Sequence, residues 1–245
     1  MSSAVVGGAP FGVRGGSACH SGEMSDPKQN LTEAEIRDAG LADWRQIWSL
    51  LRARYRTGDF ATGLALVDRI GAAAEEANHH PEVALSYGLV DVTLSSHDVG
   101  GLTSRDVDLA RRISEFAAEA GVSADTASLS RVELGLDAAD GARHAGFYAA
   151  LTGAKEAGGE VRDATGQMPT VWFQDPDPAY VAPAGEVEQR WHLDVWVAHD
   201  EASARLQAVL DAGGRLVDDS HAPSFWVLAD ADGNRHCICT PLERD

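Results

Sequence analysis

Cysteine is scarce in this chain of 245 residues, which contains only Cys19, Cys237 and Cys239. A Cys-x-Cys pair with one distant partner is not the pattern of a disulfide framework, so a reducing cytoplasm is the expected compartment. The sequence also lacks the uninterrupted apolar run of about 18 residues that a membrane-spanning helix needs. These two absences argue against a disulfide-stabilised secreted protein and against a membrane protein.

Basic residues are also few, because 20 Lys and Arg side chains stand against 38 Asp and Glu, which gives a formal net charge of −18. A surface of this sign repels phosphate, so we expect neither nucleic acid nor a membrane as a partner. Apolar residues are plentiful at 44% of the chain. This content and the chain length suffice for two domains with their own cores.

The N-terminal segment is rich in Gly and Ser and has no basic residue before its short apolar run, which makes it a poor signal peptide. Residues 1–28 are therefore expected to form a flexible tail. Met24 opens a more ordinary beginning, MSDPKQNLTEAEI. Residues 1–23 are thus either part of the native protein or an upstream extension of the reading frame.

The segment after the tail shows helix and strand patterns in turn. Apolar residues at steps of three and four predict two amphipathic helices, over residues 60–77 and 107–120. Residues 90–94 alternate between apolar and polar, which predicts a strand with one wet face. His97 points to that open face by parity. Short strands or a hairpin are expected before the first helix, after a capping box that begins at Thr32.

Two adjacent histidines lie where the first predicted helix ends, in the sequence EEANHHPEV. The proline after them prevents the helix from continuing. His79 and His80 alone admit three interpretations, which are a helix end stabilised by the helix dipole, zinc ligands, or a proton-transfer pair. Zinc ranks below proton transfer, because no acidic or cysteine ligand stands at a familiar metal spacing around them and His97. Asp106 is also ambiguous, since Thr103-x-x-Asp106 has the spacing of a capping box.

Taken together, these residues form one extended motif. It reads Glu75-x3-His79-His80-Pro81, then Tyr87, then His97, then GGLTSRD ending at Asp106. The motif resembles the signature of the pterin-4a-carbinolamine dehydratases, and the resemblance extends from about Leu41 to residue 117. It implies a small α+β domain, here residues 29–122, whose four-stranded antiparallel sheet carries helices on one face.

The same resemblance implies an activity, the dehydration of a 4a-hydroxytetrahydropterin such as 4a-hydroxytetrahydrobiopterin to quinonoid dihydropterin. A pterin is then the small-molecule partner, no cofactor is expected, and the expected assembly is a homo-oligomer, either a dimer or a tetramer. Expelling the 4a-hydroxyl as water requires a proton on oxygen while N5 gives one up. Histidine is the side chain whose unperturbed pKa lies near neutrality, so the chemistry favours this residue type.

Roles for the site residues follow from the resemblance. His79 and His97 are the expected proton-transfer residues, and His80 binds the pterin or assists. Glu75 and Asp106 would orient imidazoles or hold their charge. The aromatic position beside the family's pocket is matched by Trp44. Some members carry an acid where this chain has Asn78, a departure that alters the charge of the pocket but removes no histidine.

The second half of the chain repeats itself. A pattern of strand, Asp and helix occurs twice, in RVELGLDAADGARHAGFYAAL and in RWHLDVWVAHDEASARLQAVL. The segment AGGEVRD that follows the first copy corresponds to AGGRLVDD after the second. This repetition predicts an internally duplicated domain over residues 131–245, after a linker at residues 123–130. The pattern resembles the glyoxalase and bleomycin-resistance group, the vicinal-oxygen-chelate fold of paired βαβββ modules.

Metalloenzymes of that group place His, Glu or Gln on strands that face a central cup. The corresponding residues here are Glu133, Gln174 and His192, whereas the last ligand position falls on Cys237 or His236. The set is incomplete as a metal site, so we expect no bound catalytic metal. In the alternative interpretation, Glu133 and His192 are only polar residues that line a concave sheet.

Two functions of different class remain open. In the first, the protein is a dehydratase that acts through His79, His80 and His97, and the C-terminal domain is accessory. In the second, the C-terminal cup carries the main function, as a small-molecule binding, resistance or lyase module, and the N-terminal domain is a dimerising or sensory appendage. The presence of all three histidines at the right spacing favours the first. The polar boundary between the halves predicts that each domain folds alone.

Overall fold

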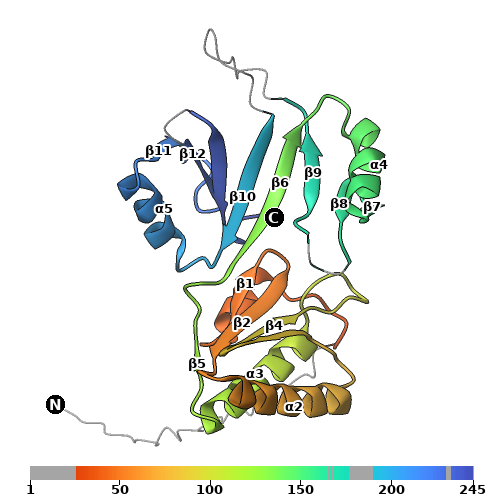
Figure 1. The fold of residues 1–245 in the computed structure, drawn as a ribbon, viewed down its shortest axis with the longest axis vertical. Helices are drawn as coiled ribbons and strands as arrows, with labels where there is room; N and C mark the ends of the chain where they lie inside the picture. The colour runs from red at the N-terminus through yellow and green to blue at the C-terminus, as the bar shows by residue number, and fades with distance from the viewer. Residues whose placement is uncertain (1–25, 165, 167, 177–189, 230–232, 245) are drawn as a thin grey trace, which may run out of the picture.

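The computed structural model describes residues 26–164, 166, 168–176, 190–229 and 233–244, which form two α+β domains in succession (Figure 1). The tail expected at residues 1–28 lies outside these residues, apart from its last three. Within the described ranges, no helix is long and apolar enough to cross a membrane.

The N-terminal domain alternates helices with antiparallel strands. Its elements are α1 (Glu33–Asp38), β1 (Arg45–Ile47), β2 (Leu50–Arg56), α2 (Phe60–Ala77), β3 (Glu82–Ser86), β4 (Leu89–Leu94), α3 (Ser104–Glu119) and β5 (Ser123–Ala124). The sheet contains the predicted antiparallel strands in the order β1-β2-β4-β3, and β5 adds a fifth strand beside β2. Helices α2 and α3 cover the face that is directed away from the second domain (Figure 1).

Periodicity explains which face of the sheet is buried. Val90, Val92 and Leu94 alternate along β4 and are 0% exposed, because they point at the helices. The polar residues between them lie on the open face, where Arg54 of β2 forms a two-point ion pair with Asp91 of β4. The predicted strand with one wet face is therefore confirmed.

The end of this sheet differs from the prediction. Residues 123–130 were expected to form a linker, but Ser123–Ala124 pairs with Tyr55 and Arg56 of β2. The reason is that β1 pairs only with the first part of β2, residues 50–52, and leaves the later part open on that edge. The first domain therefore extends beyond the predicted boundary at residue 122.

The C-terminal domain consists of two βαβββ modules. The first contains β6 (Ser130–Asp137), α4 (Gly141–Thr152), β7 (Lys155–Ala157), β8 (Glu160–Arg162) and β9 (Val171–Gln174). The second contains β10 (Trp191–Val197), α5 (Ala202–Asp211), β11 (Arg215–Asp218), β12 (Phe225–Ala229) and β13 (Arg235–Cys239). The strand order β11-β12-β13-β10-β6-β9-β8-β7 has the same arrangement on both sides of the central β6–β10 pair, which confirms the predicted duplication.

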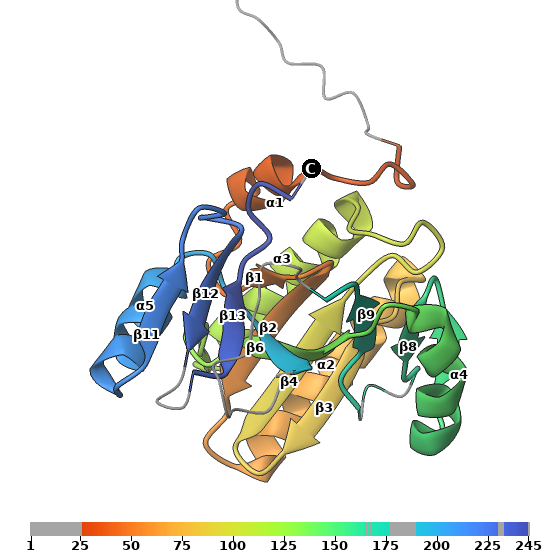
Figure 2. The same cartoon turned by 90° about the horizontal axis from the view of Figure 1, so that it is seen from above.

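The two domains share a small apolar cluster. Ile47, at the tip of the β1–β2 hairpin, is 0% exposed and packs with Leu129, Trp196 and Cys239. An ion pair between Arg45 and an aspartate of the second domain borders this cluster. From above, α1 lies beside the last residues of the chain (Figure 2). The domains are therefore joined by packed side chains as well as by the connecting segment.

Candidate active site

Helix α2 ends in a way that turns the histidines away from its axis. Asn78 adopts a left-handed conformation with φ 45°, its N–H donates to the carbonyl of Glu75 (3.2 Å), and the His79 N–H donates to that of Ala74 (3.1 Å). This pair of bonds is a Schellman motif, and asparagine tolerates the left-handed position better than most residues. Asn78 therefore has a backbone role here, beyond its effect on the charge of the site.

His79 points inward from this turn and meets a buried carboxylate. Its Nε2 lies 2.7 Å from Oδ1 of Asp106, and the two residues are 7% and 0% exposed. Because a carboxylate only accepts hydrogen bonds, the ring donates through Nε2. In the neutral imidazole, Nδ1 is then the nitrogen that accepts a proton. Asp106 thus fixes the tautomer and orientation of this ring.

The second oxygen of Asp106 accepts two short hydrogen bonds and a longer one of 3.4 Å from the Thr103 hydroxyl. The Ser96 hydroxyl and the Thr103 backbone N–H each donate to Oδ2 over 2.7 Å. The bond from Thr103 completes the capping box predicted at the start of α3. One buried carboxylate therefore holds together the end of α2, the segment after β4 and the first turn of α3.

Sequence reasoning missed Ser96, although a signal for it exists. Ser96 shares the parity of Val92 and Leu94, so it points inward and is 1% exposed. A polar side chain at an inward position needs a hydrogen-bond partner, and this serine has two in Asp106 and Thr103. The parity of the strand would have identified it.

His97 follows Ser96 directly and is exposed. Its Nδ1 lies 3.4 Å from the Ser95 hydroxyl. The position of this histidine is set by the turn after it, in which the Ser96 N–H donates to the carbonyl of Gly101 over 2.8 Å. Gly100 makes the turn possible with φ 68°. Because Ser96 is bonded to Asp106, the segment that carries His97 is anchored to the partner of His79.

Glu75 contacts a different histidine from the one that helical spacing suggests. Its Oε1 lies 3.1 Å from Nε2 of His80, and the side chains are 80% and 55% exposed. His79 is no longer on the helix face of Glu75, because the left-handed Asn78 ends the helical repeat first. Two imidazoles therefore have one carboxylate partner each, one pair buried and one in solvent.

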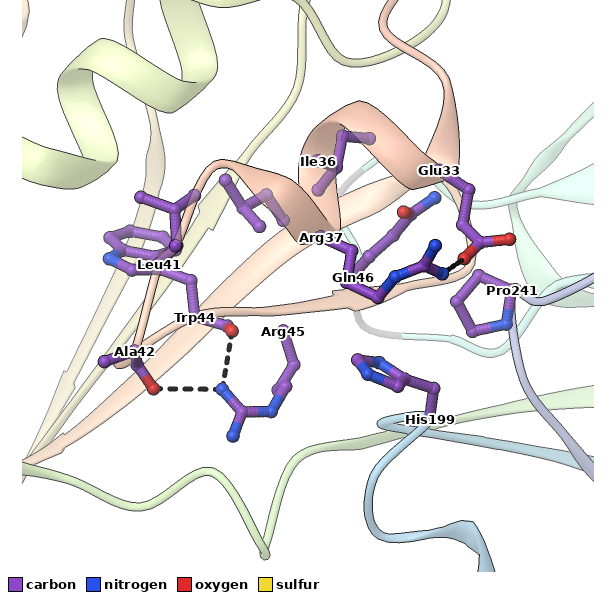
Figure 3. A pocket seen from close by; sticks show the side chains of 12 residues that line it. Glu33, Ile36, Arg37, Leu41, Ala42, Trp44, Arg45, Gln46, His199 and Pro241 are labelled. Carbon is purple, nitrogen blue, oxygen red and sulfur yellow. Dashed lines mark hydrogen bonds and ion pairs between the residues drawn. The ribbon is translucent and has the colours of Figure 1, made fainter.

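The structure places Trp44 apart from these contacts. Its indole is 2% exposed, packs edge-on with Tyr55 at 6.4 Å between ring centroids, and donates from Nε1 to Ser114 of α3 over 3.0 Å. Trp44 also borders a cavity of about 350 Å³ between the domains, to which the second domain contributes His199 and Pro241 (Figure 3). None of the three site histidines lines this cavity. A ring so deeply buried offers little area for stacking on a substrate.

The C-terminal domain contains a second cavity of about 350 Å³, the cup, in the concave face of its sheet. Two of the three predicted ligand candidates, Gln174 and His192, line it. Glu133 does not; its side chain is buried and accepts a hydrogen bond from Trp196 Nε1 over 2.9 Å. Burial raises the pKa of Glu133.

The donor set of the cup does not fit a metal ion. No group of three His, Cys, Asp or Glu side chains within the described part of the chain is arranged to hold one. At the last ligand position, a hydrogen bond with Cys239, together with burial, raises the pKa of the Cys237 thiol. Gln174 donates from Nε2 to Asp137 over 2.7 Å.

Comparison with known proteins decides the family. Residues 29–116 match the family described as "Pterin 4 alpha carbinolamine dehydratase". A protein of Thermosynechococcus vestitus named "Putative pterin-4-alpha-carbinolamine dehydratase" is 40% identical over 91 residues, which cover 36% of this chain and 96% of that protein. The chain belongs to the pterin-4a-carbinolamine dehydratase family. A protein of the same name from Nocardia farcinica is 44% identical over 89 residues, covering 36% of this chain and 94% of the relative.

Another part of this pterin-4a-carbinolamine dehydratase family member matches a different family. Residues 133–239 match the family described as "Glyoxalase-like domain". A crystal structure of a transcriptional coactivator/pterin dehydratase from Brucella melitensis is 31% identical, covers 36% of this chain and 99% of its own, and has a TM-score of 0.35. The chain therefore joins a domain of the dehydratase family to a glyoxalase-like domain.

Proposed function

We propose that the N-terminal domain dehydrates a 4a-hydroxytetrahydropterin, such as 4a-hydroxytetrahydrobiopterin, by general acid and base catalysis. Membership of the dehydratase family supports the reaction class. The observation that carries the mechanism is the buried His79–Asp106 pair, to which Ser96 anchors the segment carrying His97. A carboxylate behind an imidazole stabilises the charge that the ring gains when it takes a proton.

The reaction needs one proton removed and one delivered. We assign removal of the N5 proton to His79 through Nδ1, because Asp106 stabilises the imidazolium that forms. His97, which is exposed, delivers a proton to the 4a-hydroxyl. The C4a–O bond then breaks, water leaves and the C4a–N5 double bond forms. His80, held by Glu75 in solvent, binds the pterin.

The full chain should accelerate this dehydration without added metal, and EDTA should leave the rate unchanged, because imidazole catalysis requires no metal ion. The rate is measured spectroscopically on freshly generated 4a-hydroxytetrahydropterin, with the spontaneous reaction as the baseline. Loss of activity on chelation that zinc restores would replace this mechanism with a metal site at the same histidines. A rate equal to the baseline would reject the activity itself.

Substitution of His80 by alanine should raise KM several-fold, while kcat stays within about threefold of the value for the unmodified chain. The reason is that His80 is expected to contact the substrate equally well in the ground state and in the transition state. Its effect on stability should be small, because an exposed ion pair contributes only about 0–1 kcal/mol. The matched control is Glu76→Gln, which removes the neighbouring exposed carboxylate that pairs with Arg112. A fall in kcat as large as that for His79 would assign His80 to proton transfer.

We also propose that the protein works as a cytoplasmic homo-oligomer, a dimer or a tetramer. Phe60 and Leu64, one turn apart on α2, are 48% and 45% exposed and provide apolar surface for self-association. Cys237 and Cys239 are free thiols, in keeping with a reducing compartment. The molar mass in solution, from light scattering, tests the assembly.

A further inference from the structure

A short segment before α1 contacts the turn that carries His97, and we call residues 28–31 of this segment the strap. The strap begins in a turn, in which the Gln29 N–H donates to the Asp26 carbonyl and the Lys28 N–H donates to the Asp26 carboxylate, each over 2.9 Å. An aspartate that accepts hydrogen bonds from the residues after it is typical of such turns. At its other end the strap runs into the capping box of α1. Local hydrogen bonds therefore order the chain at both ends of the strap.

The backbone of the strap is bonded to the far end of the turn. The Leu31 N–H donates to the carbonyl of Leu102 over 2.8 Å, and the neighbouring carbonyl of Gly101 accepts from the Ser96 N–H over 2.8 Å. The end of the turn is thus held on one side by the segment after β4 and on the other side by the strap. His97 lies between these two attachments, so a movement of the strap is passed on to its backbone.

The side chain of Asn30 lies against the turn itself. Its Nδ2 donates to the carbonyl of Val99 over 3.4 Å. A Cβ at Gly101 would lie 2.8 Å from Oδ1 and 3.1 Å from Nδ2 of this asparagine. Gly101 does not have a positive φ, in contrast to Gly100, so a glycine is needed here for space. The amide therefore occupies a place that the missing side chain leaves open.

A third contact holds the residue after His97. Nζ of Lys28 lies 3.8 Å from Oδ2 of Asp98, whose other oxygen accepts a hydrogen bond from Arg105 of α3 over 2.7 Å. All three side chains are partly exposed, so each pair contributes little energy by itself. Together the pairs fix the direction of Asp98 between the strap and α3.

We propose that the strap is a positioning device for His97, and that Asn30 is its positioning residue. This inference rests on the role proposed for His97, the delivery of a proton to the 4a-hydroxyl. The imidazole is exposed and its contact with Ser95 is long at 3.4 Å, so the position of the backbone determines where the ring reaches. Proton transfer depends steeply on that position, because the reacting atoms must lie within hydrogen-bond reach.

The first test is Asn30→Ala in the full chain. It should lower kcat about tenfold and leave KM within about twofold, because the displaced acid acts in the transition state. The midpoint of thermal unfolding should not change, since Asn30 is exposed. Asn30→Gln retains the amide donor and should recover most of the rate. The matched control is Gln29→Ala, which changes the exposed neighbour and should leave kcat unchanged.

The second test is a double-mutant cycle between Asn30 and Gly101. Gly101→Ala should lower kcat by a similar factor, because its Cβ displaces the amide. The same substitution should add little to Asn30→Ala, in which there is no amide to displace. Effects that multiply would show that the two residues act separately, and the role of Asn30 would be rejected.

Amide hydrogen exchange, followed by NMR, reports on the turn without any need for activity. The N–H groups of Ser96 and Gly100 are bonded within the turn, and both should exchange about tenfold faster in Asn30→Ala. Unchanged exchange, or a kcat within about twofold of the unmodified chain, overturns the proposal. If the unmodified chain does not exceed the spontaneous rate, the proposed function fails, and the exchange rates still decide whether the strap holds the turn.

Discussion

Replacing His79 with alanine is expected to lower the dehydration rate at saturating substrate by about 10²–10⁴-fold, the usual effect of losing a general base. The imidazole is the only group bonded to Oδ1 of Asp106 within the described part of the chain, so its removal also leaves a buried carboxylate oxygen unpaired. Single-turnover kinetics on freshly generated substrate measure the loss.

A second variant separates chemistry from folding. His79→Gln retains an amide that can donate to Asp106, so it should preserve more of the stability and still lack the base. His144→Ala, on α4 of the other domain, is the control for losing a histidine away from the site. If His79→Gln retains more than about a tenth of the rate, His79 has a structural role and the proton is taken elsewhere.

Replacing Asp106 with alanine should lower the free energy of unfolding by about 3–5 kcal/mol, the usual cost of removing one partner from a buried ion pair. Three donors that lie 2.7 Å from the carboxylate lose their acceptor at once, which are the His79 ring, the Ser96 hydroxyl and the Thr103 N–H. Both Asp106 and Thr103 are 0% exposed, so water cannot substitute without opening the structure. Urea unfolding followed by circular dichroism measures the change.

Asp108→Ala, two residues along α3, is the matched control. Asp108 is 72% exposed and pairs with Arg111 on the surface, so its removal should cost less than about 1 kcal/mol. Asp106→Asn keeps the volume but places an amide where one of the three donors needs an acceptor, so it should lose activity even where it remains folded. A cost below about 1 kcal/mol for Asp106→Ala would show that the three segments meet without this carboxylate.

The elements that sequence analysis predicted well are those whose pattern is local. Helix α2 begins and ends at the predicted residues, because its apolar stripe has a clear period and Asp59 caps it. Thr103 and Asp106 formed the predicted capping box, since capping depends on four consecutive residues. The duplicated modules could also be predicted, because a repeat can be recognised in the sequence without knowing the long-range contacts.

The features that it missed depend on which segments meet in space. The resemblance gave Asp106 as a residue that would orient an imidazole, but the sequence does not show that the imidazole is that of His79, 27 residues before it. The pairing of β5 with β2 depends on how far β1 extends, which hydrophobic alternation does not show. Trp44 was placed beside the pocket by resemblance, whereas packing against Tyr55 and α3 buries it.

The packing of Ile47 against Trp196 and Cys239 has a consequence for how the protein melts. A fully buried isoleucine contributes about 1.5–3 kcal/mol, and this one contributes only while both domains are folded. Unfolding of either domain therefore removes this packing from the other domain. The unfolding temperatures of the two domains, measured by calorimetry, should therefore lie closer together than those of the separate domains. The relatives, which are covered almost completely by the first domain alone, have no second domain to shield this surface. Excising the first domain would thus expose the apolar side chain of Ile47 at the tip of the β1–β2 hairpin.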